Sequence, residues 1–470
     1  MRLRFEIELA RLAGRLSRIA ARGGGTTLPG KILATLDPAA VATLARRLPL
    51  GCALVTGTNG KTTTAAMTAE ILATRVRLAH NRAGANLVSG VASTLIESNG
   101  ADLGLFEVDE GAFPEVARRT RPRAVCLANL FRDQLDRYGE LELVAERWRT
   151  AVAELAPAAS VVANADDPLI ANLARGRQNV VRFGLDDPAV ARERLPHAAD
   201  SKYCVDCGTP YAYETAYVGH LGAYRCPRCG NARPILDVAA RGVSLDGIEH
   251  ASFDLVTSDG TRRVVLGLPG LYNVYNALAA ASLALVLGAT LADVADGLGR
   301  FRAAFGRFER IPVGERTVLI LLVKNPAGAN EAIRTLLDGR PPALAVVALN
   351  DEIADGRDVS WIWDVDFELL AGSLERLIAS GSRAHELALR FKYGGLDASR
   401  IEVVPALERA LDRALELTPP GGELPVLPTY TAMLALRKIA SARGLVRPYW
   451  EAHGGSEVSP VNPLLKDRDV

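Results

Sequence analysis

The chain has 470 residues, a formal net charge of +1, 49% hydrophobic residues and 23% charged residues. These values are typical of a soluble globular protein of two or three domains, and a net charge near zero excludes a general electrostatic attraction to nucleic acid. Because no run of about 18 apolar residues occurs and no apolar segment follows the first few residues, neither a membrane-spanning helix nor a secretory signal is expected.

The opening segment, MRLRFEIELARLAGRLSRIAAR, predicts a basic amphipathic helix with an apolar stripe from Leu9 through Leu12 and Leu16 to Ile19. Two interpretations stay open. The favoured one is that the helix packs on its own domain, and the other is that it lies on the anionic inner face of the membrane. Both agree with a cytoplasmic location, and we assign residues 1–50 to an N-terminal helical segment.

Residues 55–64, VTGTNGKTTT, are typical of a phosphate-binding loop. They follow the apolar run GCALV, which predicts a buried strand, and they lead into a predicted helix. Gly57 and Gly60 permit a tight turn whose N–H groups can face an anion, while Lys61 supplies a cation and Thr62 a hydroxyl for Mg²⁺. The spacing is shorter than the usual G-x-x-x-x-G-K-[ST], so the strand–loop–helix context carries the prediction. The alternative is a glycine turn with a surface lysine.

From Gly51 onward, short apolar runs that end in polar residues alternate with helical patterns. This alternation predicts a doubly wound parallel sheet with its chemistry at the carboxyl ends of the strands. Glu107 ends one such run, and we predict it as a further Mg²⁺ ligand. The other polar residues after these strands are Asp109 and Glu110, for which a solvated strand end is the alternative, then Asn129, Asp133 and Asp136, and then Asn164, Asp166 and Asp167.

Four of the six cysteines form two C-x-x-C pairs, YCVDCG and YRCPRCG, on either side of residues 208–225. This spacing predicts a zinc ribbon inserted at about residues 202–233, in which four thiolates close a tetrahedral site, so that the zinc is structural. Disulfides are the poorer interpretation because no export signal is present. The predicted zinc ligands are Cys204, Cys207, Cys226 and Cys229.

Residues 235–270 alternate polar and apolar side chains between Gly and Asp turns, which predicts antiparallel strands, and a strongly apolar helix follows. A second alternating region begins after GRFERIPVGE and predicts a second α/β domain. We therefore expect a central ATP-binding domain at residues 51–312 and a C-terminal Rossmann-like α/β domain at residues 313–470.

Six motifs occur in the order in which Mur ligases carry them: GTNGKTTT, NLFRDQLDRYGE, NADDP, GLYNVYNALAA, GRFER and KNPAG. The chain therefore resembles the Mur ligase superfamily over nearly its whole length. The ribbon, the KNPAG turn and the later segment DGRDVSWIWDVDFE narrow the resemblance to the ligase subunits of lipid II isoglutaminyl synthases. The implied fold is α/β, a Mur ligase-type P-loop central domain with an inserted zinc ribbon, plus the C-terminal α/β domain.

The resemblance implies an ATP-dependent amidation in peptidoglycan biosynthesis. ATP would phosphorylate the α-carboxylate of the D-glutamate in the lipid II stem peptide. Ammonia would then displace phosphate from this acyl phosphate to give D-isoglutamine, while the protein chiefly positions the reactants and neutralises the transferring charge. The implied cofactors are ATP, Mg²⁺ and Zn²⁺.

Site residues are carried over motif by motif. Arg307 matches an arginine that reaches the γ-phosphate from the domain junction, against the alternative of an ordinary linker residue in a salt bridge. It joins Lys61 and Glu107 as a catalytic residue, and Thr62 and Glu107 would hold Mg²⁺. The residues expected to cradle the phosphates are Gly57, Thr58, Asn59, Gly60, Lys61, Thr62 and Thr63, and those expected near the adenine are Asn164, Asp167, Asn273 and Asn276.

Three departures separate the chain from the amino-acid-adding Mur ligases. Those relatives have a histidine where Gln134 stands and a histidine where Lys324 stands. They also have a carbamylated lysine soon after the first histidine, whereas here no lysine occurs between Lys61 and Lys202. Glu142 or Glu146 is a candidate replacement for the carbamate. Together these changes fit a ligase whose nucleophile is ammonia.

Nothing in the chain resembles a glutaminase, so the resemblance implies a separate GatD-like glutamine amidotransferase subunit that supplies ammonia. By resemblance, Asp358 would complete the partner's Cys–His pair as a triad. Asp351 and Asp355 stay open because spacing alone does not separate the three acids, and the alternative is that they cap a turn. The other expected partner is lipid II at the membrane surface, and no nucleic acid is expected.

Two other functions remain as alternatives. One is an amino-acid-adding Mur or folylpolyglutamate-type ligase, which the ribbon, the missing lysine and the DGRD segment disfavour. The other is a nucleotide-gated zinc-ribbon binding protein, which the near-zero charge and the lack of a basic stripe disfavour.

Overall fold

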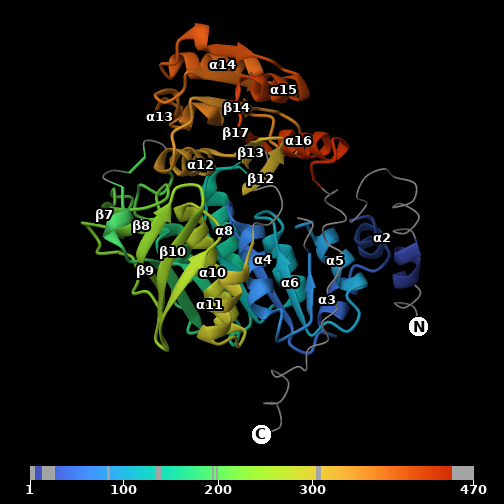
Figure 1. Ribbon diagram of the computed structural model, residues 1–470. Coiled ribbons are helices and arrows are strands. Elements are labelled where there is room, and N and C mark those ends of the chain that lie inside the picture. The colour runs from blue at the N-terminus through green and yellow to red at the C-terminus, as the bar shows by residue number, and fades with distance from the viewer. Residues whose placement is uncertain are drawn as a thin grey trace.

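The computed structural model describes residues 6–12, 27–81, 85–133, 139–192, 195–196, 199–302 and 308–446. Two α/β units are stacked, with the smaller, C-terminal one above the larger in Figure 1 and a small ribbon at the side of the larger. None of the helices within these ranges is long and apolar enough to cross a bilayer.

The larger unit is built on one nine-stranded sheet. From β2 to β9 every neighbouring pair is parallel, and β9, β10 and β11 continue the sheet as an antiparallel meander. The strand order is β11-β10-β9-β6-β5-β4-β1-β3-β2, which confirms the predicted doubly wound parallel sheet. The strands are β1 (Cys52–Thr56), β2 (Leu78–His80), β3 (Leu103–Glu107), β4 (Ala124–Leu127), β5 (Ser160–Asn164), β6 (Val180–Leu185), β9 (Val238–Asp246), β10 (His250–Thr257) and β11 (Gly260–Leu266).

Helices cover both faces of this sheet, which explains why β1 and β3 are continuous apolar runs buried at every position. One face carries α4 (Lys61–Leu72), α10 (Leu271–Val286) and α11 (Leu291–Arg300). The other face carries α2 (Leu28–Leu36), α3 (Ala40–Ala45), α5 (Val88–Glu97), α6 (Phe113–Thr120), α8 (Leu141–Ala153) and α9 (Pro168–Leu173).

The N-terminal segment packs on this second face. Ile7 and Ala10 are buried in the same apolar cluster as Leu33. The predicted apolar stripe was wrong in its register, because Leu9 and Leu12 are exposed. Leu16 and Ile19 lie outside the described residues.

The smaller unit has a six-stranded sheet in the order β12-β13-β17-β14-β15-β16, parallel except for the first pair. The expected domain boundary at 312/313 falls inside β12, whose hydrogen bonds belong to this second sheet. Its strands are β12 (Phe308–Val313), β13 (Arg316–Leu321), β14 (Leu344–Ala348), β15 (Arg376–Ser380), β16 (Ile401–Val403) and β17 (Glu423–Pro428). Its helices are α12 (Pro326–Asp338), η2 (Ser360–Asp364), α13 (Phe367–Ala371), α14 (Ala384–Tyr393), η3 (Ala398–Arg400), α15 (Leu407–Leu417) and α16 (Tyr430–Ala442).

The ribbon is inserted between β6 and β9, which are direct neighbours in the large sheet. After the short η1 (Pro188–Val190), it forms an antiparallel hairpin of β7 (Ala212–Ala216) and β8 (Gly222–Arg225). An insertion between adjacent parallel strands leaves the sheet intact, so the ribbon lies at the carboxyl ends of β5 and β6 rather than in the core.

Candidate active site

The predicted phosphate loop joins β1 to α4, and its shape depends on close packing at a glycine. Gly60 has φ 79°, and a Cβ built there would lie 1.9 Å from Oδ1 of Asn276 on α10. Only glycine combines this left-handed conformation with such a close approach. The loop is therefore pressed against the N-terminal turns of α10.

The side chain of Asn129 holds the other side of the loop. Its Oδ1 accepts a hydrogen bond from the backbone N of Asn59 (2.8 Å), and its Nδ2 donates to the carbonyl of Asn59 (3.0 Å). The backbone N of Thr58 also donates to the carbonyl of Asn129 (3.0 Å). Asn129 follows β4, so two neighbouring strand ends fix the loop together.

Lys61 is held by a carboxylate. Its Nζ lies 2.8 Å from Oε2 of Glu110, and both side chains are only 6% exposed. The interpretation of Glu110 as a solvated strand end is therefore wrong, and that of Asp109 as well, since both residues are buried. Lys61 also donates to the carbonyl oxygens of Gly57 and Thr58, which keeps the ammonium inside the loop.

Thr62 and Glu107 lie together as predicted for a Mg²⁺ site. The Thr62 hydroxyl donates to Oε2 of Glu107 (2.7 Å), and the Asn81 side chain bonds both the N–H and the carbonyl of Glu107. Hydroxyl and carboxylate oxygens are the ligands that Mg²⁺ prefers, so these residues fit the ion.

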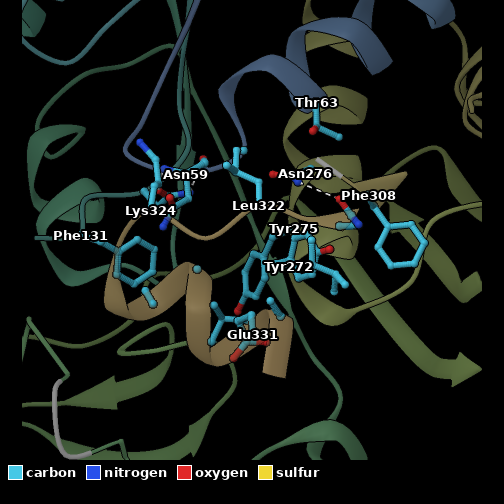
Figure 2. A pocket seen from close by; sticks show the side chains of 18 of the residues that line it. Asn59, Thr63, Phe131, Tyr272, Tyr275, Asn276, Phe308, Leu322, Lys324 and Glu331 are labelled. Carbon is cyan, nitrogen blue, oxygen red and sulfur yellow. Dashed lines mark hydrogen bonds between the residues drawn. The ribbon is translucent and has the colours of Figure 1, made fainter. Parts of the chain in front are cut away.

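A pocket lies between the two units, next to the loop (Figure 2). The larger unit contributes five of the predicted residues, together with Phe131, Tyr272 and Tyr275. The smaller unit contributes Phe308 from β12, Lys324 and part of α12. The predicted residues on the lining are Asn59, Gly60, Thr63, Asn273 and Asn276.

Two polar contacts join the units at this pocket. The side-chain amides of Asn59 and Asn325 bond each other in both directions, at 3.2 and 3.0 Å. Nζ of Lys324 lies 2.6 Å from Oδ2 of Asp133. Residues of the KNPAG turn therefore reach the phosphate loop and the NLFRDQ segment directly.

Two residues predicted near the adenine are not among those that line this pocket. Asn164 donates to the carbonyl of Ala128 (2.9 Å), and Asp167 caps α9 and accepts from the backbone N of Leu130 (2.8 Å). Asn164 is 1% exposed and Asp167 is fully buried. In the structure they hold the loop that follows β4, so they act on the pocket through Asn129 and its neighbours.

Asp166, which the sequence places after a strand without indicating a role, is a fully buried link between segments. Its carboxylate accepts from Arg233 (3.0 Å), from the hydroxyl of Tyr275 (2.7 Å) and from the backbone N of Leu185 (2.8 Å). Burial raises the pKa of Asp166, although the Arg233 guanidinium opposes that shift. The motif NADDP marks Asp166 as a polar residue after a strand. Its role as a link between segments is visible only in its contacts with residues distant along the chain.

The remaining predicted catalytic residues lie apart from the pocket or outside the described part. Arg307 is outside it, although its neighbour Phe308 lines the pocket. Asp358 is on the surface of the smaller unit, at the start of η2, where one oxygen accepts from the backbone N of Ser360 (2.8 Å). Asp355 is buried and its two oxygens both bond Thr431. Asp351 accepts from Ser382 (2.7 Å).

The four predicted cysteine ligands come together in the ribbon. Their sulfur atoms all lie within 4.8 Å of one another, and the Cys204–Cys229 and Cys207–Cys226 pairs are each 3.5 Å apart. Four sulfurs at these separations fit a closed tetrahedral thiolate site, which suits Zn²⁺. The cluster is compatible with zinc and leaves no protein position open for catalysis.

Sequence comparison gives matches to two family profiles. The profile described as Mur ligase middle domain matches residues 55–223, and the one described as MurT ligase C-terminal matches residues 322–433. The subunit MurT of lipid II isoglutaminyl synthase (glutamine-hydrolyzing) from Streptococcus pneumoniae is 33% identical over 95% of this chain and 99% of its own length. The MurT subunit from Staphylococcus aureus strain N315 is 31% identical over 92% and 96%.

Solved structures share the fold. A pseudomurein peptide ligase type C from Methanothermus fervidus superimposes with a TM-score of 0.65 at 24% identity, covering 83% of this chain and 78% of the ligase. MurF from Acinetobacter baumannii superimposes with a TM-score of 0.64 at 20% identity, covering 87% and 80%. The fold is thus of the Mur ligase type.

The packing at Gly60 predicts a specific loss of nucleotide affinity. Gly60→Ala would place a methyl group against Asn276, so we expect the dissociation constant for a nucleotide to rise at least about tenfold. Gly176→Ala is the matched control, because Gly176 has φ 83° but a Cβ added there would have no atom within 4 Å. It should cost about 1 kcal/mol of unfolding free energy and leave affinity unchanged. Equal nucleotide affinity in both variants would contradict the packing argument.

The pair Thr62–Glu107 predicts a change in metal dependence. Thr62→Val removes the hydroxyl and keeps the shape, so the half-saturating Mg²⁺ concentration for nucleotide turnover should rise between about 10- and 100-fold. Thr62→Ser keeps the hydroxyl and should behave like the parent protein. If the valine variant has the parental Mg²⁺ dependence, Thr62 is not a metal ligand.

Proposed function

Because this chain belongs to the MurT family of ligase subunits, we propose that it catalyses the ligase reaction of a lipid II isoglutaminyl synthase. The product would be D-isoglutamine in the lipid II stem peptide, made for peptidoglycan. The observation that carries the proposal is the pocket of Figure 2, where the phosphate loop of the larger unit faces Lys324 and Asn325 of the smaller. Such a junction can bring a nucleotide and an acceptor carboxylate together.

The chemistry proceeds in two steps. A carboxylate oxygen of D-glutamate attacks the γ-phosphorus of ATP, the bond to ADP breaks, and an acyl phosphate forms. Ammonia then attacks the acyl carbon, the carbon–oxygen bond to phosphate breaks, and the nitrogen loses a proton to leave the amide. A carboxylate is a poor electrophile until its oxygen becomes part of a phosphate leaving group, which is why the first step is needed.

Residues of this chain would bind the phosphates and the metal ion that carry charge during the phosphate transfer. Lys61 and the N–H groups of residues 57–60 would bind the β- and γ-phosphates, with Lys61 exchanging Glu110 for the phosphate oxygens. Thr62 and Glu107 would hold Mg²⁺, which neutralises phosphate charge when bound. Lys324, which donates to Asp133, would approach the transferring group from the second unit.

The ammonia would come from a GatD-like glutaminase, and Asp358 is the residue proposed to complete its triad. Hydrogen bonds from Ser360 lower the pKa of Asp358, so its carboxylate is ionised at neutral pH as an imidazole partner requires. Asp358 is exposed, whereas the oxygens of Asp355 are committed to Thr431. These observations favour Asp358 over Asp355.

The surface next to Asp358 supports a protein partner there. Ile353 is 77% exposed, Trp363 51% and Tyr393 72%. The rings of Trp363 and Tyr393 are 6.0 Å apart, and the Arg390 guanidinium lies 5.5 Å from the Trp363 ring centre. Arg390 is itself buried and holds the Trp363 ring in place, while exposed aromatic side chains are typical of the central residues of protein interfaces.

The direct test is mass spectrometry of lipid II incubated with ATP, Mg²⁺ and this chain. Replacement of OH by NH₂ should appear with ammonium alone, and with glutamine only after a GatD-like subunit is added. No mass change under any condition, in folded and zinc-loaded protein, would favour a ligase with another acid or nucleophile.

The two nitrogen sources also test Asp358. Asp358→Asn should reduce glutamine-driven turnover by about 10²- to 10⁴-fold while ammonium-driven turnover stays near the parental rate, because the acid acts only on the partner's imidazole. Asp355→Asn is the control, since loss of its Thr431 contacts would affect both nitrogen sources through stability. Equal losses with both sources in Asp358→Asn would give this residue a structural role instead.

A further inference from the structure

The turn of the ribbon hairpin forms one wall of the pocket. Residues 217–221 connect β7 to β8, and both Val218 and Leu221 line the pocket beside Tyr275 and Asn276. Leu221 is 1% exposed and Val218 5%, so these side chains are packed inward. A segment of the cysteine ribbon is therefore part of the site.

The same turn packs on the residue that supports the phosphate loop. Gly219 has φ 56°, and a Cβ built there would lie 2.8 Å from the ring of Phe131. The ring of the fully buried His220 lies 4.8 Å from the ring of Phe131. Phe131 lines the pocket, and its backbone N donates to the Thr58 hydroxyl in the loop (3.0 Å). Contact is continuous from the ribbon to the phosphate loop.

Polar contacts fix both ends of the hairpin turn beside the pocket. The backbone N of Gly222 donates to the carbonyl of Asp166 (3.0 Å), while the Asp166 carboxylate binds Arg233 at the end of the ribbon and Tyr275 on the pocket wall. At the other end, the carbonyl of Tyr217 accepts from two arginines of the neighbouring segments, Arg192 (3.0 Å) and Arg334 (3.2 Å). The turn is thus held at the junction of both units.

Away from its turn, which packs in the core of the larger unit, the ribbon has little apolar packing of its own. Its buried cluster consists of Cys204, Cys226, Tyr211 and Tyr224, with Cys207 and Tyr213 partly buried around it. A two-stranded hairpin with so small a core is marginal in water. Metal binding to the four thiolates would supply the missing stability, as it does in other small thiolate-bound domains.

We propose that the zinc ribbon is a positioning element for the nucleotide: metal bound by the four cysteines orders the hairpin, and the hairpin turn, residues 217–221, forms the pocket wall. Val218 and Leu221 are then positioning residues. Loss of the metal weakens nucleotide binding while the transfer chemistry at the loop is retained. This inference rests on the proposed function, because it requires that the pocket bind a nucleotide.

The test uses the full-length chain with its glutaminase partner and measures ADP affinity, zinc content and hydrogen exchange. Cys229→Ser changes an exposed ligand and should lose zinc, raise the ADP dissociation constant about tenfold, and increase exchange in residues 217–221. KM for ATP should rise by a similar factor, while kcat at saturating ATP changes less than about twofold. Arg228→Ala, an exposed neighbour in the same knuckle, is the matched control and should keep parental values.

A second variant distinguishes the effect of the pocket wall on ADP binding from the effect of zinc. Leu221→Ala should retain zinc and still raise the ADP dissociation constant several-fold, and combining it with Cys229→Ser should give less than the sum of the two effects on binding free energy. Parental ADP affinity in a zinc-free Cys229→Ser, or in Leu221→Ala, would overturn the inference. Zinc-loaded parental protein that binds no ADP would overturn the proposed function, and this inference with it.

Discussion

The hydrogen bonds between Asn129 and Asn59 are the constraint on which the site depends. A glycine-containing loop has little shape of its own, and here one amide satisfies both backbone groups of Asn59 at the point where the chain must turn. With that side fixed, Gly60 can press against Asn276 without a Cβ between them. The loop, the end of β4 and the start of α10 therefore form one unit, and Lys61 and Thr62 begin α4 from a defined position.

The smaller, C-terminal unit supplies the second wall of the pocket beside the phosphate loop. Asn325 caps α12 by accepting from Gly328, and the same side chain bonds Asn59, so the N-terminus of α12 is directed at the phosphate loop. A helix N-terminus favours negative charge, as the N-terminus of α4 does. The N-terminal residues of both helices therefore line the pocket. Neither unit alone provides this arrangement.

The fold and the loop were predictable because their signals are local. Strand, Gly-Lys-Thr and helix follow one another within a few residues, and C-x-x-C spacing identifies the cysteine cluster. Glu110, Asn129 and Asp166 could not be given functions from the sequence, because their partners are distant along the chain and polar residues also occur at solvated strand ends. The motif that contains Asn164 and Asp167 was assigned to the adenine by resemblance, and in the structure both side chains bind backbone groups. That a ribbon turn lines the pocket has no sequence signal, since Val218 and Leu221 are ordinary apolar residues.

The charges of the site explain how it can discriminate among ligands. Lys61 is paired with Glu110 and Lys324 with Asp133, and three of these four side chains are at most 6% exposed. A buried cation without a partner is costly, so Lys61 in particular must keep an anion near it. A ligand that recruits both lysines has to offer enough negative charge to replace both carboxylates. Glu142 and Glu146, the candidate replacements for the carbamate, are exposed on α8, whereas the carboxylates that pair with Lys61 and Lys324 are those of Glu110 and Asp133.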